Sequence, residues 1–165
     1  MKKITYAKFP FLQGQILLAK TEKGLARINF GDKKYIEETE AKLKSTYHAE
    51  ENPGKLEQEY IKIKQYWDNP AKTPDIQLDI EGTEFQKKVW HEISKIPAGK
   101  TATYTDIAKK IGNKRAIRAV ANACAANKIP LIIPCHRVIR KDRTLGGYSG
   151  GLNIKEELLR KEKAI

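Results

Sequence analysis

The chain has 165 residues, of which 40% are hydrophobic and 32% are charged, and this composition excludes an intrinsically disordered chain. No apolar run reaches the length needed to cross a bilayer, and residues 1–11 lack the apolar core of a signal peptide. Two cysteines are too few for a disulfide framework. We therefore expect a cytoplasmic protein with reduced thiols and no membrane partner.

Positive charge is concentrated in the second half of the chain. Residues 1–80 hold 14 Lys and Arg against 12 Asp and Glu, a sum of +2, whereas residues 81–165 hold 18 against 8, a sum of +10. Such asymmetry is typical of a protein in which one half meets a polyanion such as nucleic acid. A lysine-rich solvated surface gives the same numbers, so charge alone leaves both interpretations open.

The first 80 residues predict a small α/β domain that begins with a hairpin. Residues 15–20 and 25–30 have strand-like sequences separated by a Gly-containing turn, which indicates two antiparallel strands. Asp32 is placed to cap a helix that runs to about Tyr47. A sheet covered by at least one helix is therefore expected.

A second helix and a short strand follow in the same domain. Apolar residues recur at helical spacing from Leu56 to Trp67. Residues 76–80 alternate apolar and polar side chains, as a half-buried strand does. We place the domain boundary after this strand, with a support domain over residues 1–80 and a second domain over residues 81–165.

The second domain predicts helices joined by short turns. Thr83 and Gln86 have the spacing of a capping box. A short helix over residues 105–111 and an Ala-rich helix over residues 115–126 flank a Gly-containing turn, which resembles a helix-turn-helix. The predicted fold class is mixed α/β (α+β): a small N-terminal β-sheet-plus-helix domain, then a mainly helical, winged helix-turn-helix-like domain.

The most informative stretch is residues 132–138, in which Cys135 and His136 are adjacent. Thiolate is the nucleophilic form of cysteine, and a nearby base together with positive charge lowers a thiol pKa. His136 offers the base. The positive charge would come from the basic residues that follow, which are Arg137, Arg140, Lys141 and Arg143. On an extended chain, adjacent side chains point to opposite faces, so the thiol and the imidazole need not touch directly, but a bridging water or a turn could still connect them. An ordinary buried thiol is the competing interpretation, and it is the one we favour for Cys124.

The C-terminal residues form a glycine-rich loop and a last helix. The loop, residues 145–151, lacks the Lys-Ser/Thr ending of a phosphate-binding loop. It suits either closure over a flat ligand or a plain linker. Asn153 is placed to cap the helix that follows. Glu162 at the end of that helix is either surface charge or a partner for a histidine.

In combination, residues 82–163 resemble the O6-alkylguanine-DNA alkyltransferases, also called methylated-DNA–protein-cysteine methyltransferases. The resemblance rests on Phe85-Gln86, Val89-Trp90, Ile96-Pro97, Gly99, Thr103-Tyr104, Ile107-Ala108, Arg118-Ala119-Val120, Asn127, Pro134-Cys135-His136-Arg137-Val138, residues 146–151, Lys155 and Leu158-Leu159. The Pro-Cys-His-Arg-Val string is highly specific for this family when it occurs together with these other motifs. Residues 1–80 fit only loosely, as the variable N-terminal domain of such proteins.

The resemblance implies DNA repair by a single-turnover enzyme. Cys135 as thiolate would take the alkyl group from O6-alkylguanine in double-stranded DNA after the base is flipped out of the helix. His136 would accept the thiol proton through a water, oriented by Glu162, with Asn127 completing the network. Tyr104 would hydrogen-bond the base and assist the departing guanine. The alkyl group would stay on sulfur, so each protein would act once.

The resemblance also implies how the damaged base and the DNA are held. Residues expected to form the base pocket are Val138, Tyr148, Ser149 and Pro130. Residues expected to meet DNA in the minor groove are Arg118, Tyr104, Thr105, Ala116, Ile117 and Ala121, with Arg118 filling the gap in the base stack. No cofactor and no metal are implied, and the protein is expected to be a monomer.

The sequence departs from the family pattern at several positions. Ile117 is bulkier than the alanine often found beside the arginine, which puts its groove contact in doubt. Asn127 is followed by Lys128 rather than proline. The first domain has no cysteine for the zinc site that some relatives carry, and Cys135 excludes the subgroup that lacks the cysteine.

Two other classes of protein compete with this interpretation. A non-catalytic lesion-binding or regulatory helix-turn-helix protein would bind DNA without alkylation of Cys135. A Cys-His hydrolase or redox enzyme would turn over a small substrate repeatedly and would need neither Tyr104 nor Arg118.

Overall fold

The computed structural model describes residues 1–165, and contacts divide them into two units. The first unit is residues 1–65 with 74–80, and the second is residues 66–73 with 81–165. The first is built on a sheet and the second is mainly helical, so the predicted mixed α/β class is confirmed. The boundary that we placed before Glu81 stays a prediction for the folding domains.

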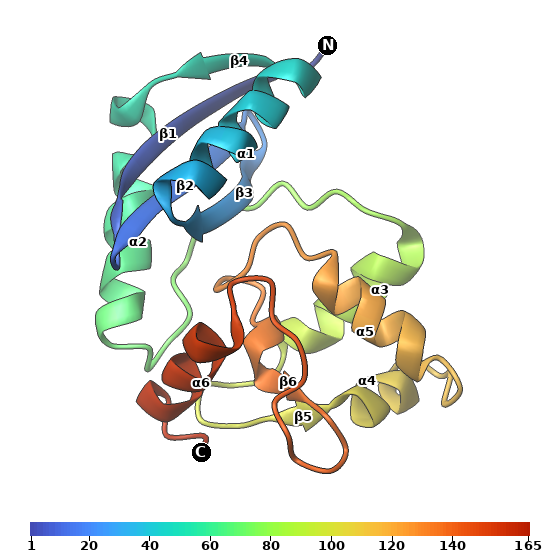
Figure 1. The fold of residues 1–165 in the computed structure, drawn as a ribbon. Helices are drawn as coiled ribbons and strands as arrows, with labels where there is room; N and C mark the ends of the chain where they lie inside the picture. Colours follow the sequence, from blue (N-terminus) through green and yellow to red (C-terminus); the bar gives the residue numbers. More distant parts are fainter. The chain divides into compact units, whose positions relative to one another are not determined.

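A four-stranded sheet forms the frame of the first unit (Figure 1). Its order is β3 (Gly24–Gly31), β2 (Gly14–Thr21), β1 (Lys3–Phe11) and β4 (His48–Glu51). The first three strands are antiparallel neighbours, and β4 runs parallel to β1. The hairpin predicted from the turn between β2 and β3 is confirmed.

Helices cover both faces of this sheet, because side chains alternate along each strand. Helix α1 (Lys33–Thr46) is capped by Asp32 and buries Ile36 and Leu43 against one face. The strand residues in that core are Ile4, Tyr6, Leu17 and Ala19. Helix α2 (Glu57–Asp68), which follows the short 3₁₀ helix η1 (Pro53–Lys55), meets the other face, where the rings of Phe9 and Tyr60 stack at 4.2 Å.

The strand predicted for residues 76–80 is wrong as a regular strand. Only Leu78 pairs, in an isolated parallel bridge with Leu25. Backbone bonds from Leu25 N to Gln77 O and from Asp79 N to Leu25 O hold the segment at one point beside β3. The alternation of apolar and polar residues therefore corresponds to a single bridge at Leu78 and not to continuous strand pairing.

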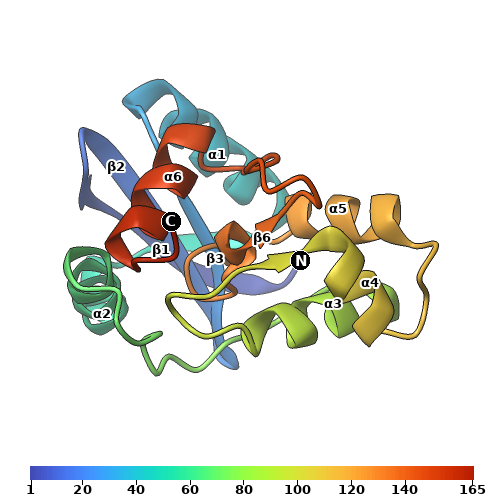
Figure 2. The same cartoon turned by 90° about the horizontal axis from the view of Figure 1, so that it is seen from below.

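Three helices pack together in the second unit: α3 (Glu84–Ser94), α4 (Tyr104–Lys110) and α5 (Ile117–Ala125) (Figure 2). The predicted capping box of α3 is confirmed, because Thr83 Oγ1 accepts from Gln86 N and Gln86 Oε1 accepts from Thr83 N. A second capping box joins Thr103 and Asp106 at the start of α4. The helix pair α4–α5 has the order expected of a helix-turn-helix.

The remaining elements of this unit lie around the turn that contains Cys135. Strand β5 (Ala102–Thr103) pairs with β6 (Val138–Ile139), which directly follows the 3₁₀ helix η2 (Cys135–Arg137). The chain ends in α6 (Leu152–Lys161). Its cap is Gly151 with φ 99°, so the predicted cap at Asn153 is wrong: the helix starts one residue earlier, and Asn153 lies inside its first turn. No helix is long and apolar enough to cross a membrane.

Candidate active site

A buried turn presents the cysteine and the histidine. Cys135, His136 and Arg137 form the 3₁₀ helix η2 after Pro134, and their exposed fractions are 5%, 0% and 1%. Of the two backbone conformations considered for Cys135 and His136, extended chain and turn, the structure has the turn. In a 3₁₀ helix successive side chains project about a third of a turn apart. The thiol and the imidazole therefore contact different neighbouring residues.

Asn127 holds the sulfur of Cys135. Its Nδ2 donates to Cys135 Sγ at 3.2 Å and to the carbonyl of Ile133 at 2.9 Å, while its Oδ1 accepts from Ile129 N at 2.9 Å. A backbone carbonyl and a backbone amide thus fix which end of the side-chain amide faces the sulfur. Because the sulfur receives a donor, this contact favours thiolate over thiol.

The environment of Cys135 contains opposing influences on its pKa. Burial raises the pKa of the thiol, while the Asn127 hydrogen bond and the positive charge of Lys155 lower it, and burial dominates. The resting group at neutral pH is therefore the thiol, and a base has to remove its proton when the reaction occurs.

The bond between His136 and Glu162 fixes the tautomer of the imidazole. His136 Nε2 lies 3.0 Å from Glu162 Oε1. Hydrogen bonds from His136 and Arg137 hold the pKa of Glu162 at about 2 against the opposing effect of burial, so the carboxylate is ionised and can only accept. Nε2 must then donate. Burial lowers the pKa of His136, so the ring is neutral at pH 7 and its lone pair sits on Nδ1, which is buried and has no hydrogen-bond partner.

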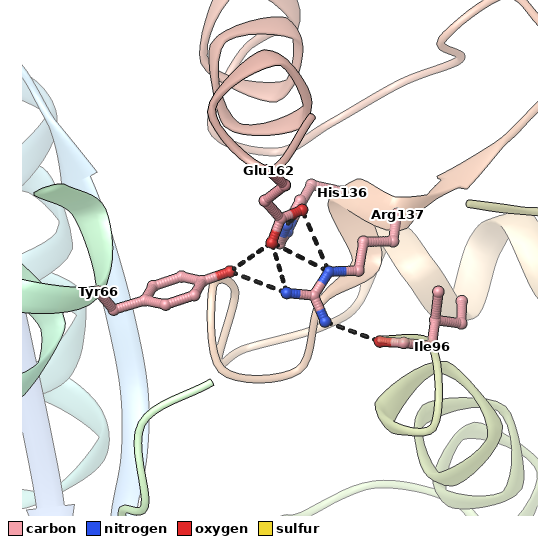
Figure 3. Close-up of polar contacts among 5 residues, drawn as sticks. All are labelled: Tyr66, Ile96, His136, Arg137 and Glu162. Atoms are coloured by element: carbon pink, nitrogen blue, oxygen red, sulfur yellow. Dashed lines mark hydrogen bonds and ion pairs between the residues drawn. The ribbon is translucent and has the colours of Figure 1, made fainter. Parts of the chain in front are cut away.

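Glu162 is held from several sides (Figure 3). Arg137 Nε lies 3.2 Å and 3.1 Å from the two carboxylate oxygens, and its Nη2 lies 2.5 Å from Oε2. Arg137 Nη1 donates to the carbonyl of Ile96 at 2.7 Å. Tyr66 OH donates to Glu162 Oε2 at 3.1 Å and accepts from Arg137 Nη2 at 3.2 Å.

The predicted source of positive charge beside the thiol needs correction. Arg137 is committed to Glu162, and the next three basic residues, Arg140, Lys141 and Arg143, are exposed. Instead the field comes from Lys155 on α6, which is completely buried. Its Nζ donates to the carbonyls of Val138, Leu145 and Gly147 at 2.7, 2.5 and 3.2 Å. Burial lowers the pKa of Lys155 to about 8.

The same lysine fixes the glycine-rich loop, which packs closely on Tyr104. Gly146 has φ 72°, and a Cβ placed on it would lie 2.8 Å from Tyr104 OH. Burial raises the pKa of Tyr104 to about 12, so its hydroxyl remains a proton donor. The ring of Tyr148 meets that of His136 edge-on at 6.3 Å, and Tyr148 OH is buried without a partner.

The other predicted site residues lie on three parts of the second unit. Thr105, Ala116, Ile117, Arg118 and Ala121 lie on or just before α4 and α5; Ile117, 42% exposed, and Arg118 face solvent, and the other three are half-buried. Val138 and Pro130 are buried on either side of η2, and Ser149 is exposed in the loop.

Three residues of the network make buried contacts that the sequence did not reveal. Lys155 had a signal, because a lysine three and four residues before Leu158 and Leu159 falls on the apolar stripe of α6. Arg137 was noticed for its charge but not for its pairing. Tyr66 gave no signal beyond its place in an amphipathic helix.

Comparison with known proteins decides the family. Residues 84–164 match the family described as "6-O-methylguanine DNA methyltransferase, DNA binding domain", and residues 2–80 match its "ribonuclease-like domain". The chain belongs to the 6-O-methylguanine DNA methyltransferase family. The predicted resemblance is thereby confirmed for both halves, including residues 1–80, where the sequence alone gave only a loose fit.

Individual relatives of this family member align with nearly all of the chain. The methylated-DNA–protein-cysteine methyltransferase of Methanosarcina acetivorans is 44% identical over 95% of this chain and 97% of its own. The bifunctional transcriptional activator/DNA repair enzyme Ada of Escherichia coli is 41% identical over 96% of this chain, which spans 45% of Ada. The crystal structure of Mycobacterium tuberculosis OGT in complex with DNA aligns with a TM-score of 0.83 at 33% identity, over 96% of this chain and 92% of that one.

Proposed function

We propose that this protein repairs O6-alkylguanine in double-stranded DNA by transferring the alkyl group once to its own Cys135. The observation that carries the proposal is a buried thiol, held by Asn127, beside which in the chain stands a neutral histidine whose Nδ1 is buried without a hydrogen-bond partner. This pair lies within the segment that matches the DNA binding domain of the family.

The residues support a balanced transfer step. His136 Nδ1 takes the proton of Cys135 through a water, and Glu162 stabilises the imidazolium that forms. The sulfur attacks the alkyl carbon, so a carbon–sulfur bond forms as the bond from carbon to guanine O6 breaks. Guanine leaves with the electron pair of that bond and gains a proton from Tyr104. The proton that His136 took from Cys135 then returns through water to the Tyr104 oxygen, so both side chains end neutral. The thioether has no carbonyl for water to attack, and the protein therefore ends alkylated.

The base pocket and the DNA contacts are part of the same proposal and are assigned from the family resemblance. We assign the pocket walls to Val138, Pro130, Tyr148 and Ser149. The last two lie on the glycine-rich loop, to which Lys155 is hydrogen-bonded at the carbonyl of Leu145. On α4 and α5, Thr105, Ala116, Ile117 and Ala121 would meet the minor groove, and the exposed Arg118 would occupy the stack after flipping. Monomeric action in the cytoplasm, without cofactor or membrane, stays part of this proposal.

Intact-mass spectrometry tests the proposed reaction. The protein is mixed with duplex DNA that carries one O6-methylguanine and then mapped by peptides. We expect one methyl group in place of one hydrogen, on Cys135 and at most once per protein. Cys124→Ser is the matched control, since that thiol is also buried and burial raises its pKa to about 12; it should transfer normally, whereas Cys135→Ser should bind DNA without transfer. Binding without methylation of the unaltered protein would favour the lesion-binding alternative.

A further inference from the structure

The carboxylate that orients the histidine also receives a hydrogen bond from outside the DNA-binding match. Tyr66 lies in the last turn of α2 and is 3% exposed. It falls among residues 2–80, which match the ribonuclease-like domain, whereas His136, Arg137 and Glu162 fall within residues 84–164. By its contacts, however, Tyr66 belongs to the second unit.

The hydroxyl of Tyr66 has one arrangement of its hydrogen bonds. Glu162 is ionised and can only accept, and Arg137 can only donate. The tyrosine therefore donates to Glu162 Oε2 at 3.1 Å and accepts from Arg137 Nη2 at 3.2 Å (Figure 3). Burial raises the pKa of Tyr66, so the hydroxyl keeps its proton over the whole working range of pH.

These bonds divide the two oxygens of Glu162 between different partners. Oε2 receives Tyr66 OH and Nη2 of Arg137, and Oε1 receives His136 Nε2, while Nε of Arg137 lies between the two oxygens at 3.1 and 3.2 Å. A donor on Oε2 draws negative charge away from Oε1 and also fixes the plane of the carboxylate. Both effects act on the bond between Oε1 and the imidazole, and hence on the basicity of Nδ1.

We infer that Tyr66 is a positioning residue for alkyl transfer, which sets the basicity of His136 through Glu162. The inference rests on the function proposed above, because it gives His136 the role of base. It assigns to the segment matched as ribonuclease-like a direct part in tuning the reaction.

The charged and titratable groups around His136 define what else acts on it. They are Glu162 and Lys155 from α6, Arg137 and Cys135 from its own turn, and Tyr148 from the loop. None of these side chains changes in a Tyr66→Phe variant. Loss of the hydroxyl leaves more charge on Glu162 Oε1, which favours imidazolium, so the pKa of His136 should rise.

The test follows two quantities in the full-length protein. One is the rate of Cys135 alkylation by O6-benzylguanine as free base, measured against pH; the other is the titration of the His136 ring by NMR. Tyr66→Phe should slow alkylation about threefold to tenfold near neutral pH, because the plane of the Glu162 carboxylate, and with it the imidazole, is no longer fixed. It should also move the acid limb of the pH profile and the ring titration upward by roughly half a unit. Tyr66→3-fluorotyrosine has a more acidic hydroxyl and an almost unchanged shape, so it should move both downward.

Two control variants separate positioning from stability. Tyr60→Phe removes a hydroxyl from the same helix, where it donates to Pro10 O. Tyr6→Phe removes a buried hydroxyl that donates to Glu40 Oε2 at 2.7 Å, an equivalent tyrosine–glutamate bond in the first unit. Both should leave the pH midpoint unchanged.

The outcomes are distinguishable. If both Tyr66 variants keep the midpoint of the unaltered protein, or if Tyr66→Phe only slows the reaction as Tyr6→Phe does, the positioning role is overturned and the proposed function stands. If the unaltered protein never alkylates Cys135, the proposed function fails, and the ring titration alone decides whether Tyr66 tunes His136.

Discussion

Glu162 and His136 are joined by a bond of 3.0 Å between two side chains that are both completely shielded from solvent. The histidine is neutral and the glutamate ionised, so the proton on Nε2 is held in place and Nδ1 is left as the basic atom. The imidazole can therefore accept a proton only at Nδ1. The positive charge that the ring then carries is balanced by Glu162, which is bonded to Nε2.

Glu162→Gln should separate the electrostatic role of the carboxylate from its shape. The amide is similar in size but carries no charge, so the imidazolium loses its counter-charge and Arg137 becomes an unpaired buried cation. We expect transfer to slow by about a hundredfold and the free energy of unfolding to fall by roughly 3 kcal/mol. Single-turnover kinetics and urea unfolding measure the two effects. Glu156→Gln, on an exposed pair with Arg160 of the same helix, should change neither.

The stability of the protein should fall as the solution becomes acidic. The pKa of Glu162 is about 2 in the folded state against an ordinary 4.5, so its contribution is complete above pH 4.5 and is lost between pH 4.5 and 2. The pKa of His136 is also lowered, so protonation of the unfolded chain below about pH 6.5 adds to the loss. Urea midpoints between pH 7 and pH 3 should therefore decline, and the decline should be shallower in Glu162→Gln. Equal slopes in the two proteins would contradict this account.

Asn127→Ala should raise the pKa of Cys135. The variant removes the donor that lies 3.2 Å from the sulfur and leaves Ile129 N without its side-chain acceptor. Alkylation of Cys135 by iodoacetamide, followed by peptide mapping against pH, should shift to higher pH and slow about tenfold at neutral pH. Asn122→Ala, at an exposed position on α5, should react as the unaltered protein does. A thiol that titrates at the same pH in both variants would remove Asn127 from the network.

Elements with local signals were predictable from the sequence. A cap such as Asp32 and a turn such as residues 21–24 act within a few residues, and α1 and the β2–β3 hairpin were placed accordingly. Strand β4, by contrast, has the sequence His-Ala-Glu-Glu, which has little strand propensity. It forms because β1 offers an edge for parallel pairing, a tertiary cause that no short window contains.

The residues of the candidate site also fall into two groups, those that the sequence predicts and those that only the fold brings together. Cys135 and His136 were found because they are adjacent in a specific string, and Glu162 and Asn127 because they fit a family pattern. Tyr66 contacts Arg137 from 71 residues away along the chain, and its helix looks like any other amphipathic helix. Pairings of buried charges over such distances are set by the fold, so the nucleophile and its nearest partners could be predicted from the sequence, whereas the contacts of Tyr66 with Arg137 and Glu162 could not.

Lys155→Met should test whether a buried charge holds both the thiol and the loop. The apolar side chain has a similar length but leaves the carbonyls of Val138, Leu145 and Gly147 without their donor. We expect the pKa of Cys135 to rise, and alkylation by free O6-benzylguanine to slow by about tenfold or more. Lys87→Met, at an exposed position on α3, is the matched control. An unchanged thiol pKa in Lys155→Met would limit the lysine to support of the loop.

Two neighbouring glycines offer the sharpest test of how the loop meets Tyr104. A Cβ at Gly146 would lie 2.8 Å from Tyr104 OH and 3.2 Å from its ring, and the φ of 72° is unfavourable for alanine. A Cβ at Gly147 would meet nothing within 4 Å. Gly146→Ala should therefore displace the tyrosine hydroxyl or the loop and slow transfer from duplex DNA by about tenfold or more, whereas Gly147→Ala should stay within about twofold of the unaltered protein. Single-turnover rates on O6-methylguanine duplex measure the difference. Because both variants add one methyl group to the same loop, equal rates would mean that the close approach to Tyr104 has no part in the reaction.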